Sequence, residues 1–296
     1  MIYCVVLNWN NAVDTIECLE SLKKLSNSTF EEFRILCVDN FSSDGSYDVI
    51  KDSVKGVEYI RTGANLGYSG GNNAGIKYAL ENGADHVWIL NNDTIADKEA
   101  LNELIKPFKK EENIGATGSL ILRYGDRRTI WFAGGIYKRF SGGTTHFLEN
   151  KIYNKSMDEA IKKKKHDFLS GCSFMVSKKA LEKTGLIDDS LYLMFEEMDY
   201  FIRLRKNGFK WEIVPESVIY HKVSKTLGLS PVKLYYFSRN MVAISKKYFP
   251  LFLPFVLLFF LKWPLLSTLV KNRKNSRQVV KALIDGMCGK GGKYED

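Results

Sequence analysis

The 296-residue sequence contains only five cysteines, and no two of them are spaced as Cys-x-x-Cys. Cys4 and Cys37 fall within apolar runs that predict buried strands. We therefore expect reduced thiols that pack as small apolar side chains, as in a cytosolic protein.

A leader sequence and a simple membrane-spanning segment are not predicted either. The chain opens directly on the apolar residues 2–7, which predict a strand, so no signal peptide is expected. Near the C-terminus, residues 251–261 form an apolar run of eleven residues, which Lys262 and Pro264 interrupt. Because a membrane-spanning helix needs about 20 apolar residues, this run does not predict a simple transmembrane span.

What the sequence does contain predicts a folded chain with a basic end. Hydrophobic residues make up 45% and charged residues 26%, which argues against disorder, and the length suits one large core or one domain with an appendage. Residues 222–296 hold 14 Lys and Arg against 3 Asp and Glu, whereas residues 1–221 hold 29 against 31. Such a tail favours contact with anionic lipid or nucleic acid, although lysine is also a common solubilising residue.

The order of apolar runs predicts the fold class. In the first half, short apolar runs alternate with segments of helical spacing, and repeated β-α units imply a mostly parallel sheet covered on both faces. Residues 115–147 are rich in β-formers and glycine and predict antiparallel additions to that sheet. This α/β prediction places strands at residues 3–7, 33–38, 57–61, 87–90, 168–176, 209–214 and 218–220, and helices at residues 13–25, 42–50, 71–82, 98–109, 178–185, 195–207 and 230–248.

Residues 152–166 differ from the rest because they contain the run Lys162-Lys-Lys-Lys165. Such a run is typical of a solvated, mobile loop. Basic clusters alone are a weak signal for nucleic acid, so we expect no nucleic-acid partner.

A glycine-rich segment, residues 63–75, follows the third predicted strand and opens a helix. It includes five Gly and three Asn, but its spacing fits neither Gly-x-Gly-x-x-Gly nor Gly-x-x-x-x-Gly-Lys, so a dinucleotide fingerprint and a P-loop are both disfavoured. Glycines let a backbone approach a ligand closely, and a helix N-terminus favours anionic groups. The segment predicts an anion-binding loop, and a flexible surface loop is the alternative.

Asn91-Asn92-Asp93 stands at the end of the apolar run 86–90, which predicts a buried strand. Ligands of α/β proteins bind at the C-terminal ends of strands. One carboxylate with neighbouring amides can hold a divalent cation while leaving positions open for phosphate oxygens. The alternative is structural, because Asn-Asn-Asp followed by Thr94 also suits a turn and a helix start.

Six motifs in this order resemble glycosyltransferase family 2, the inverting enzymes of the GT-A fold. The similarity is greatest to its rhamnosyltransferase-like branch, which builds bacterial surface polysaccharides, and it covers about residues 2–240. The motifs are Val6-Leu-Asn-Trp-Asn10, Val38-Asp-Asn-Phe-Ser-Ser-Asp-Gly45, the glycine-rich segment, Leu90-Asn-Asn-Asp93, Phe195-Glu-Glu-Met-Asp199 and His221.

The resemblance implies a GT-A domain at residues 1–222, with a nucleotide-sugar half at about 1–115 and an acceptor half at about 116–222, and a helical, membrane-associating appendage at 223–296. It implies a metal-assisted single displacement that inverts the anomeric centre. The sugar, with rhamnose favoured, would move from a nucleoside-diphosphate donor to a hydroxyl of a glycan or lipid-linked glycan. A glycosidase would need two carboxyls flanking the scissile bond, whereas this chain offers one metal-type loop and a separate acidic cluster.

The resemblance also implies the residues that bind the donor. Asp39 matches the carboxylate that reads uracil or thymine, and Asp93 and His221 match the ligands of Mn²⁺ or Mg²⁺. Because Asn91 replaces the first carboxylate of the family's metal motif, metal affinity is expected to be modest. The other nucleotide-binding residues implied are Asn8, Asn10, Asn65, Gly67, Asn72 and Asn92.

A general base is implied in the acidic cluster of Glu196, Glu197 and Asp199. The family pattern is Glu-Asp-x-Asp with the second acid as the base, so Glu197 is the first choice and the other two are the alternatives. Ordinary acidic capping of a helix start is the structural interpretation of the same residues. Arg203, four residues after Asp199, is placed to pair with it.

Contacts to the acceptor or sugar are implied for the loop of Ser170 and Gly171. Trp131 either lines the acceptor cleft or packs in the core. Arg239 comes after the residue that matches the family's histidine, His221. It either contacts the diphosphate or has a packing role.

The C-terminal apolar run, with Trp263 and flanking Lys and Arg, suits an interfacial segment on the cytoplasmic face of the membrane, attached peripherally or monotopically. A helix buried against the catalytic domain is the alternative. Two other functions are considered. A nucleotidyltransferase would carry a basic Gly-rich stretch where Asn8-Trp-Asn-Asn11 stands, and a non-catalytic membrane-bound scaffold is suggested by Glu197 in place of the usual aspartate.

Overall fold

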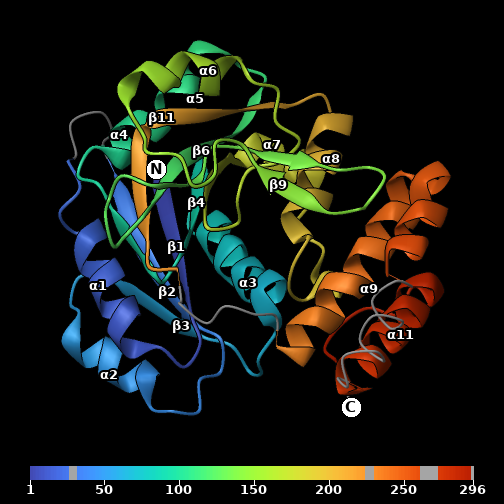
Figure 1. Cartoon of the computed structure of the whole chain (residues 1–296). Coiled ribbons are helices and arrows are strands. Elements are labelled where there is room, and N and C mark those ends of the chain that lie inside the picture. Colours follow the sequence, from blue (N-terminus) through green and yellow to red (C-terminus); the bar gives the residue numbers. More distant parts are fainter. Residues whose placement is uncertain (27–31, 224–229, 261–272, 295–296) are drawn as a thin grey trace.

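The computed structural model describes residues 1–26, 32–223, 230–260 and 273–294, which form a central sheet with helices packed around it (Figure 1). The strands are β1 (Ile2–Asn8), β2 (Phe33–Asp39), β3 (Glu58–Arg61), β4 (His86–Asn91), β5 (Thr94–Ala96), β6 (Ile114–Arg123), β7 (Ile130–Phe132), β8 (Gly135–Tyr137), β9 (Thr144–His146), β10 (Ser173–Ser177) and β11 (Lys210–His221). Nine of them form one sheet in the order β3-β2-β1-β4-β10-β6-β11-β5, with β7 paired to β6. The predicted α/β class is confirmed.

Strands β1 to β4 form a parallel half-sheet. Its register sets Asn8 of β1 opposite Asp39 of β2, and Leu7 opposite Asn91 at the end of β4. Because parallel strands end at the same edge, the polar residues that follow these buried runs meet there. The connecting helices are α1 (Ala12–Leu22), α2 (Ser46–Ser53) and α3 (Gly67–Glu81).

The other half of the sheet mixes directions. Strand β10 runs antiparallel to both β4 and β6, while β11 is parallel to β6. The short strands β5 and β7 pair antiparallel with β11 and β6, and β8 and β9 form a separate antiparallel pair. The predicted antiparallel additions are therefore confirmed, although β6 also has a parallel neighbour. Through β4 and β10 the two halves share one continuous core.

Several predicted elements differ from the structure. The segment after Asp93 is strand β5 and not a helix start, because it pairs with the end of β11. The single helix predicted at 98–109 is two, α4 (Ala100–Leu104) and α5 (Lys106–Lys110), with Pro107 in the first turn of the second. The lysine-rich loop contains the helix α6 (Asp158–Lys163), which the wholly buried Ile161 anchors to the body. The two strands predicted at 209–214 and 218–220 are one, β11, with a register shift between them.

Helix α3 begins at Gly67, four residues before the predicted start. Glycine weakens a helix interior, so the glycine-rich segment favoured a longer loop. In the structure these glycines let α3 lie close to the sheet, because a Cβ at Gly75 would lie 2.3 Å from a methyl group of Val5. Packing on the sheet thus outweighs the low helix propensity of this sequence.

The remaining helices include two that bear on the site. Helix α9 packs along α11 beside the sheet domain, and both are coloured orange to red in Figure 1.

Among the described residues, no helix is long and apolar enough to cross a membrane. The predicted interfacial residues Lys262, Trp263 and Pro264 lie outside the described part of the chain. The helical segments here are η1 (Lys155–Met157), α7 (Lys178–Thr184), η2 (Asp189–Leu191), α8 (Glu196–Lys206), α9 (Pro231–Tyr248), η3 (Pro250–Phe252) and α11 (Arg273–Cys288).

Candidate active site

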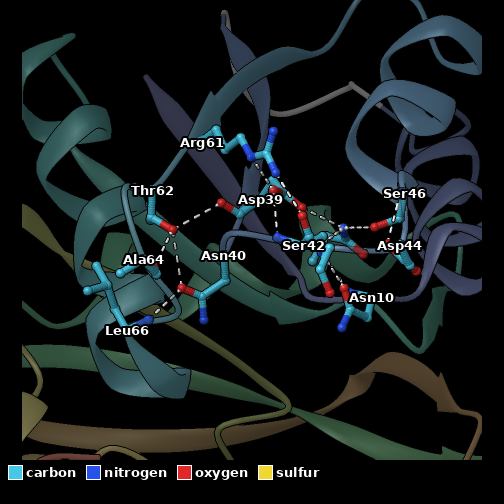
Figure 2. A network of polar contacts seen from close by, with 12 residues as sticks. Asn10, Asp39, Asn40, Ser42, Asp44, Ser46, Arg61, Thr62, Ala64 and Leu66 are labelled. Atoms are coloured by element: carbon cyan, nitrogen blue, oxygen red, sulfur yellow. Dashed lines mark hydrogen bonds and ion pairs between the residues drawn. The ribbon is translucent and has the colours of Figure 1, made fainter.

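Asp39, at the C-terminal end of β2, is a buried carboxylate with a fixed orientation (Figure 2). Its Oδ1 accepts a hydrogen bond from Asn8 Nδ2 at 2.9 Å, and its Oδ2 accepts one from the Ser42 backbone N–H at 3.0 Å. The guanidinium of Arg61 pairs with Oδ2 at 3.1 Å. Three donors therefore hold the predicted base-reading carboxylate in place at the sheet edge.

Asn8 donates a hydrogen bond to Asp39, and its side chain is wholly buried and does not reach the surface. Its Nδ2 also lies within hydrogen-bond distance of Ser42 Oγ and Ser46 Oγ, and its Oδ1 lies 2.9 Å from the Thr15 hydroxyl. A direct nucleotide contact for Asn8 would require these bonds to break. Asn10, in contrast, is exposed. Its backbone has a left-handed conformation, with φ of 53°, and its side-chain Oδ1 accepts a hydrogen bond from the backbone N–H of residue 43.

The glycine-rich segment is organised by Asn40, which the sequence motifs did not single out. Its Nδ2 donates to Gly67 O at 2.9 Å and to Asn65 Oδ1 at 3.2 Å, while its Oδ1 accepts from the Leu66 N–H at 3.0 Å (Figure 2). Asn72 lies further into α3, and its buried Oδ1 has no partner among the described residues. Asn65 and Gly67 thus stand where β2 ends and α3 begins.

The predicted metal residues Asp93 and His221 are brought together from the ends of β4 and β11. Asp93 Oδ2 lies 3.2 Å from His221 Nε2. Asp93 Oδ1 and His221 Nδ1 are buried, and within the described ranges neither has a hydrogen-bond partner. Asn92 donates to the Thr15 hydroxyl at 2.8 Å and so joins this loop to the Asn8 network.

One carboxylate and one imidazole fit a divalent cation that takes its other ligands from substrate oxygens and water. In the part of the chain that the structure describes, no group of three or more His, Cys, Asp or Glu side chains is placed to hold a metal alone.

Glu196 and Glu197 open helix α8 in a buried environment. Burial and the charge of Glu197 raise the pKa of Glu196 well above its usual range. Burial raises the pKa of Glu197 to about 7. Neither Oε2 atom has a partner among the described residues. Burial therefore favours the protonated form of both carboxyl groups.

Asp199 has a different environment, although it follows on the same helix. Burial raises its pKa, but hydrogen bonds from Lys247 and Tyr248 and the charge of Arg203 outweigh this, so the net pKa is lowered. Arg203 pairs with it at 2.6 Å, as the spacing predicted, and the other two donors lie 2.8 and 2.6 Å away. A carboxylate that already holds three donors is a poor proton acceptor, so Asp199 anchors α8 to α9.

Glu197 lines a cavity of about 160 Å³ with His146 and several aromatic residues. Trp131 connects this cavity to the metal-type loop. Its ring lies 4.4 Å from the His221 ring and 5.2 Å from the His146 ring, both edge-on. Trp131 is partly buried and packs against the core, and its two histidine contacts place it between His221 and the cavity that Glu197 lines.

The predicted acceptor loop joins both halves of the site. Gly171 O accepts a hydrogen bond from the Tyr68 hydroxyl at 2.5 Å, and Ser170 Oγ accepts from the Cys172 N–H. Burial and the charges of Glu196 and Glu197 raise the pKa of Tyr68 well above its usual range. Tyr68, which belongs to the glycine-rich segment, therefore links that segment to the acceptor loop and lies near the acidic pair, a long-range contact that the sequence alone did not reveal.

Arg239 is the site prediction that the structure corrects. It is almost fully buried on α9, and its guanidinium donates to the carbonyls of Ser190, Leu191 and Gly292 and to Asn240 Oδ1. With its donors used in this way, the packing role accounts for it and a diphosphate contact does not.

Comparisons with known proteins agree with the fold described above. The family model described as glycosyl transferase family 2 matches residues 3–185. The dTDP-rhamnosyl transferase RfbF of Shigella flexneri is 25% identical over 99% of this chain and 98% of its own length. The N-acetylglucosaminyl-diphospho-decaprenol L-rhamnosyltransferase of Mycobacterium tuberculosis is 25% identical over 71% of this chain and 73% of that protein.

Two solved structures share the fold. A mannosyltransferase from Pyrobaculum calidifontis in complex with GDP-Man and Mn²⁺ superposes with a TM-score of 0.61, at 12% identity, over 98% of this chain and 87% of that one. GalNAc-T7 with UDP, GalNAc and Mn²⁺ superposes with a TM-score of 0.64, at 16% identity, over 83% of this chain and 47% of that one. At such identities the likeness supports the fold alone.

Proposed function

Because this chain belongs to glycosyl transferase family 2, as a rhamnosyltransferase-like member with the GT-A fold, we propose that it moves a sugar, with rhamnose favoured, from a nucleoside diphosphate to a hydroxyl of a glycan or lipid-linked glycan. The observation that carries the proposal is the position of Trp131, whose ring contacts both His221, the neighbour of Asp93, and His146, which lines the cavity of Glu197. Family membership favours glycosyl transfer over the nucleotidyltransferase alternative.

Donor binding is assigned to the sheet edge. Asp39 would accept the imide N–H of uracil or thymine, a role that suits a carboxylate already oriented by Asn8, Ser42 and Arg61. The similarity to the dTDP-rhamnosyl transferase RfbF makes a dTDP-linked sugar the favoured donor. The diphosphate would lie toward the start of α3, where the helix dipole favours an anion.

A Mn²⁺ or Mg²⁺ ion, when bound, would neutralise the departing diphosphate. Asp93 and His221 would hold it, since both have a buried atom without a partner among the described residues.

Glu197 is the proposed general base. As the acceptor hydroxyl attacks the anomeric carbon, its proton passes to the Glu197 carboxylate, and the bond to the nucleoside diphosphate breaks. A pKa of about 7 suits this task, because a base works best when its pKa lies near the operating pH. Glu196 remains protonated beside it, and Asp199 positions the helix.

The membrane is the proposed partner of the C-terminal region. Leu251 is 85% exposed and lies with other exposed apolar residues of the segment 251–259. Phe140, at the turn between β8 and β9, is 67% exposed and packs against Phe252 at 5.0 Å and Phe255 at 5.6 Å. Together with the basic excess of residues 222–296, this surface suits peripheral or monotopic attachment to an anionic cytoplasmic leaflet.

A thermal-shift panel with UDP, dTDP and GDP, each with and without Mn²⁺, tests the donor assignment. We expect the largest rise in Tm with dTDP or UDP and Mn²⁺ together. Donor turnover by the wild type, and its loss in Glu197→Gln, separates an enzyme from the scaffold alternative. An equal response to every nucleotide, or full turnover by the variant, would contradict these assignments.

A further inference from the structure

The loop between η2 and α8, residues 192–195, has a strained backbone directly before the acidic pair. Tyr192, Met194 and Phe195 have φ angles of 64°, 71° and 68°. Residues with a Cβ seldom adopt positive φ, so a loop with three such residues persists only where its surroundings hold it. Met194 and Phe195 also line the cavity that Glu197 enters.

Asn240 holds this loop from helix α9. Its Nδ2 lies 2.9 Å from Leu191 O, 2.8 Å from Leu193 O and 2.8 Å from Met194 O. The side chain is wholly buried, and its Oδ1 accepts from Arg239 Nε at 2.8 Å, which orients the amide. The two N–H groups of this amide are thus shared among the carbonyl groups of Leu191, just before the strained loop, and of Leu193 and Met194 within it.

Arg239 extends the same clamp to the end of the chain. Its Nη2 donates to Leu191 O at 2.8 Å, and its Nη1 donates to Gly292 O at 2.8 Å. The Gly292 N–H donates back to Ser190 O at 2.6 Å. A Cβ at Gly291 would lie 2.8 Å from Ser190 Cβ, so the tail fits closely against the segment that leads into the loop.

The loop also touches the donor half of the site. Tyr192 O accepts the Tyr68 N–H at 2.8 Å at the start of α3, and the Tyr192 hydroxyl lies 3.1 Å from Asn65 Oδ1. Gly67 is in close contact there, because a Cβ at this position would lie 2.4 Å from Tyr192 O. The strained loop therefore lies between the glycine-rich segment and the acidic pair.

We propose that Arg239 and Asn240, together with the tail residues 291–294, are positioning residues that hold the strained loop so that Glu197 faces the acceptor cavity. The inference rests on the proposed role of Glu197 as the base. A base must lie within hydrogen-bond reach of the hydroxyl, and misplacement by about 1 Å can cost on the order of 100-fold in rate. The clamp touches no substrate and acts only through the loop.

Asn240→Ser is the direct test, because serine cannot bridge three carbonyl groups. We expect kcat to fall about 100-fold, with a smaller change in the KM for the nucleotide sugar. The matched control is Ser245→Ala on the same helix, which removes a buried hydrogen bond to Tyr137 at 2.9 Å away from the loop. The control should lower the Tm without this loss of kcat.

The pH profile separates positioning from simple loss of stability. Glu197 is faced by Glu196 on its own helix, by Tyr68 from α3 and by His146 from β9, and burial lowers the pKa of His146. If the loop loosens and water reaches Glu197, the limb of the kcat/KM profile that begins near pH 7 should move to lower pH in Asn240→Ser. Lower stability alone would not move it.

Gly291→Val provides a second route if Asn240→Ser does not fold, since its side chain would push the tail from Ser190. Lys290→Ala, an exposed tail substitution, is its control. Wild-type kcat in both folded clamp variants, or a lower kcat with an unmoved pH limb, would overturn the clamp. Full activity of Glu197→Gln would instead refute the proposed base, so the two failures are distinguishable.

Discussion

Replacing Glu197 by Gln should stabilise the protein at high pH while it removes activity. The folded-state pKa of Glu197 is raised from 4.5 to about 7, so the folded protein disfavours the ionised form. The cost of ionisation is absent below pH 4.5, grows as the pH rises, and is complete above pH 7. This shift in pKa corresponds to a loss of about 3 kcal/mol in the free energy of unfolding. A glutamine at this position never ionises, so the variant does not lose this stability.

Urea unfolding of both proteins between pH 5 and pH 8 measures this effect. Relative to the wild type, Glu197→Gln should gain about 3 kcal/mol at pH 8 and less than about 1 kcal/mol at pH 5, apart from a constant offset. Glu212→Gln, at an exposed position on β11, is the control and should show little pH dependence. Glycosyl transfer by Glu197→Gln should fall by about 10²–10⁴-fold. A stability difference that is the same at both pH values would refute the buried, pKa-shifted carboxylate.

Three further predictions concern the donor, the cation and the membrane. Asp93→Asn should abolish the Mn²⁺-dependent part of the Tm rise with dTDP, while the Tm without ligand changes little. Asp39→Asn should weaken dTDP binding about 10- to 100-fold in calorimetry, because an amide meets donors where a carboxylate accepted them. Leu251→Asp with Phe255→Asp should reduce sedimentation with anionic vesicles, whereas Val13→Asp, at an exposed position on α1, should not. Unchanged metal response, nucleotide affinity or vesicle binding would contradict the respective assignment.

The parallel half-sheet was predictable because its strands are short, apolar and separated by helical spacing. The residues at which helices and strands begin and end were harder to predict. The predicted start of α3 was wrong because local propensity disfavours glycine in helices. In the structure, glycine allows close packing of this helix against Val5 and other sheet residues. Strand β5 was missed because only its partner β11, more than a hundred residues later, makes Thr94–Ala96 a strand.

Site residues at strand ends were also accessible from the sequence, since parallel topology brings such residues to one edge. Asp93 was predicted in this way, whereas Asp39 and His221 were implied by the family resemblance and lie at the ends of β2 and β11. The supporting residues were not accessible, because their role lies in contacts between distant segments. Asn240 is the example: it stands beside Arg239 in a helix, and nothing local shows that its amide meets carbonyls nearly fifty residues earlier.

The hydrogen-bonded series from Asn92 through Thr15 to Asn8 and Asp39 has a consequence for evolution and engineering. It joins the loop after β4 to the end of β2, so under the proposed donor assignment the spacing between Asp93 and Asp39 would be set before any substrate arrives. A rigid groove loses little freedom on binding. Changes of nucleotide preference are therefore expected to be tolerated better at the exposed rim, around Arg61, than within this buried series.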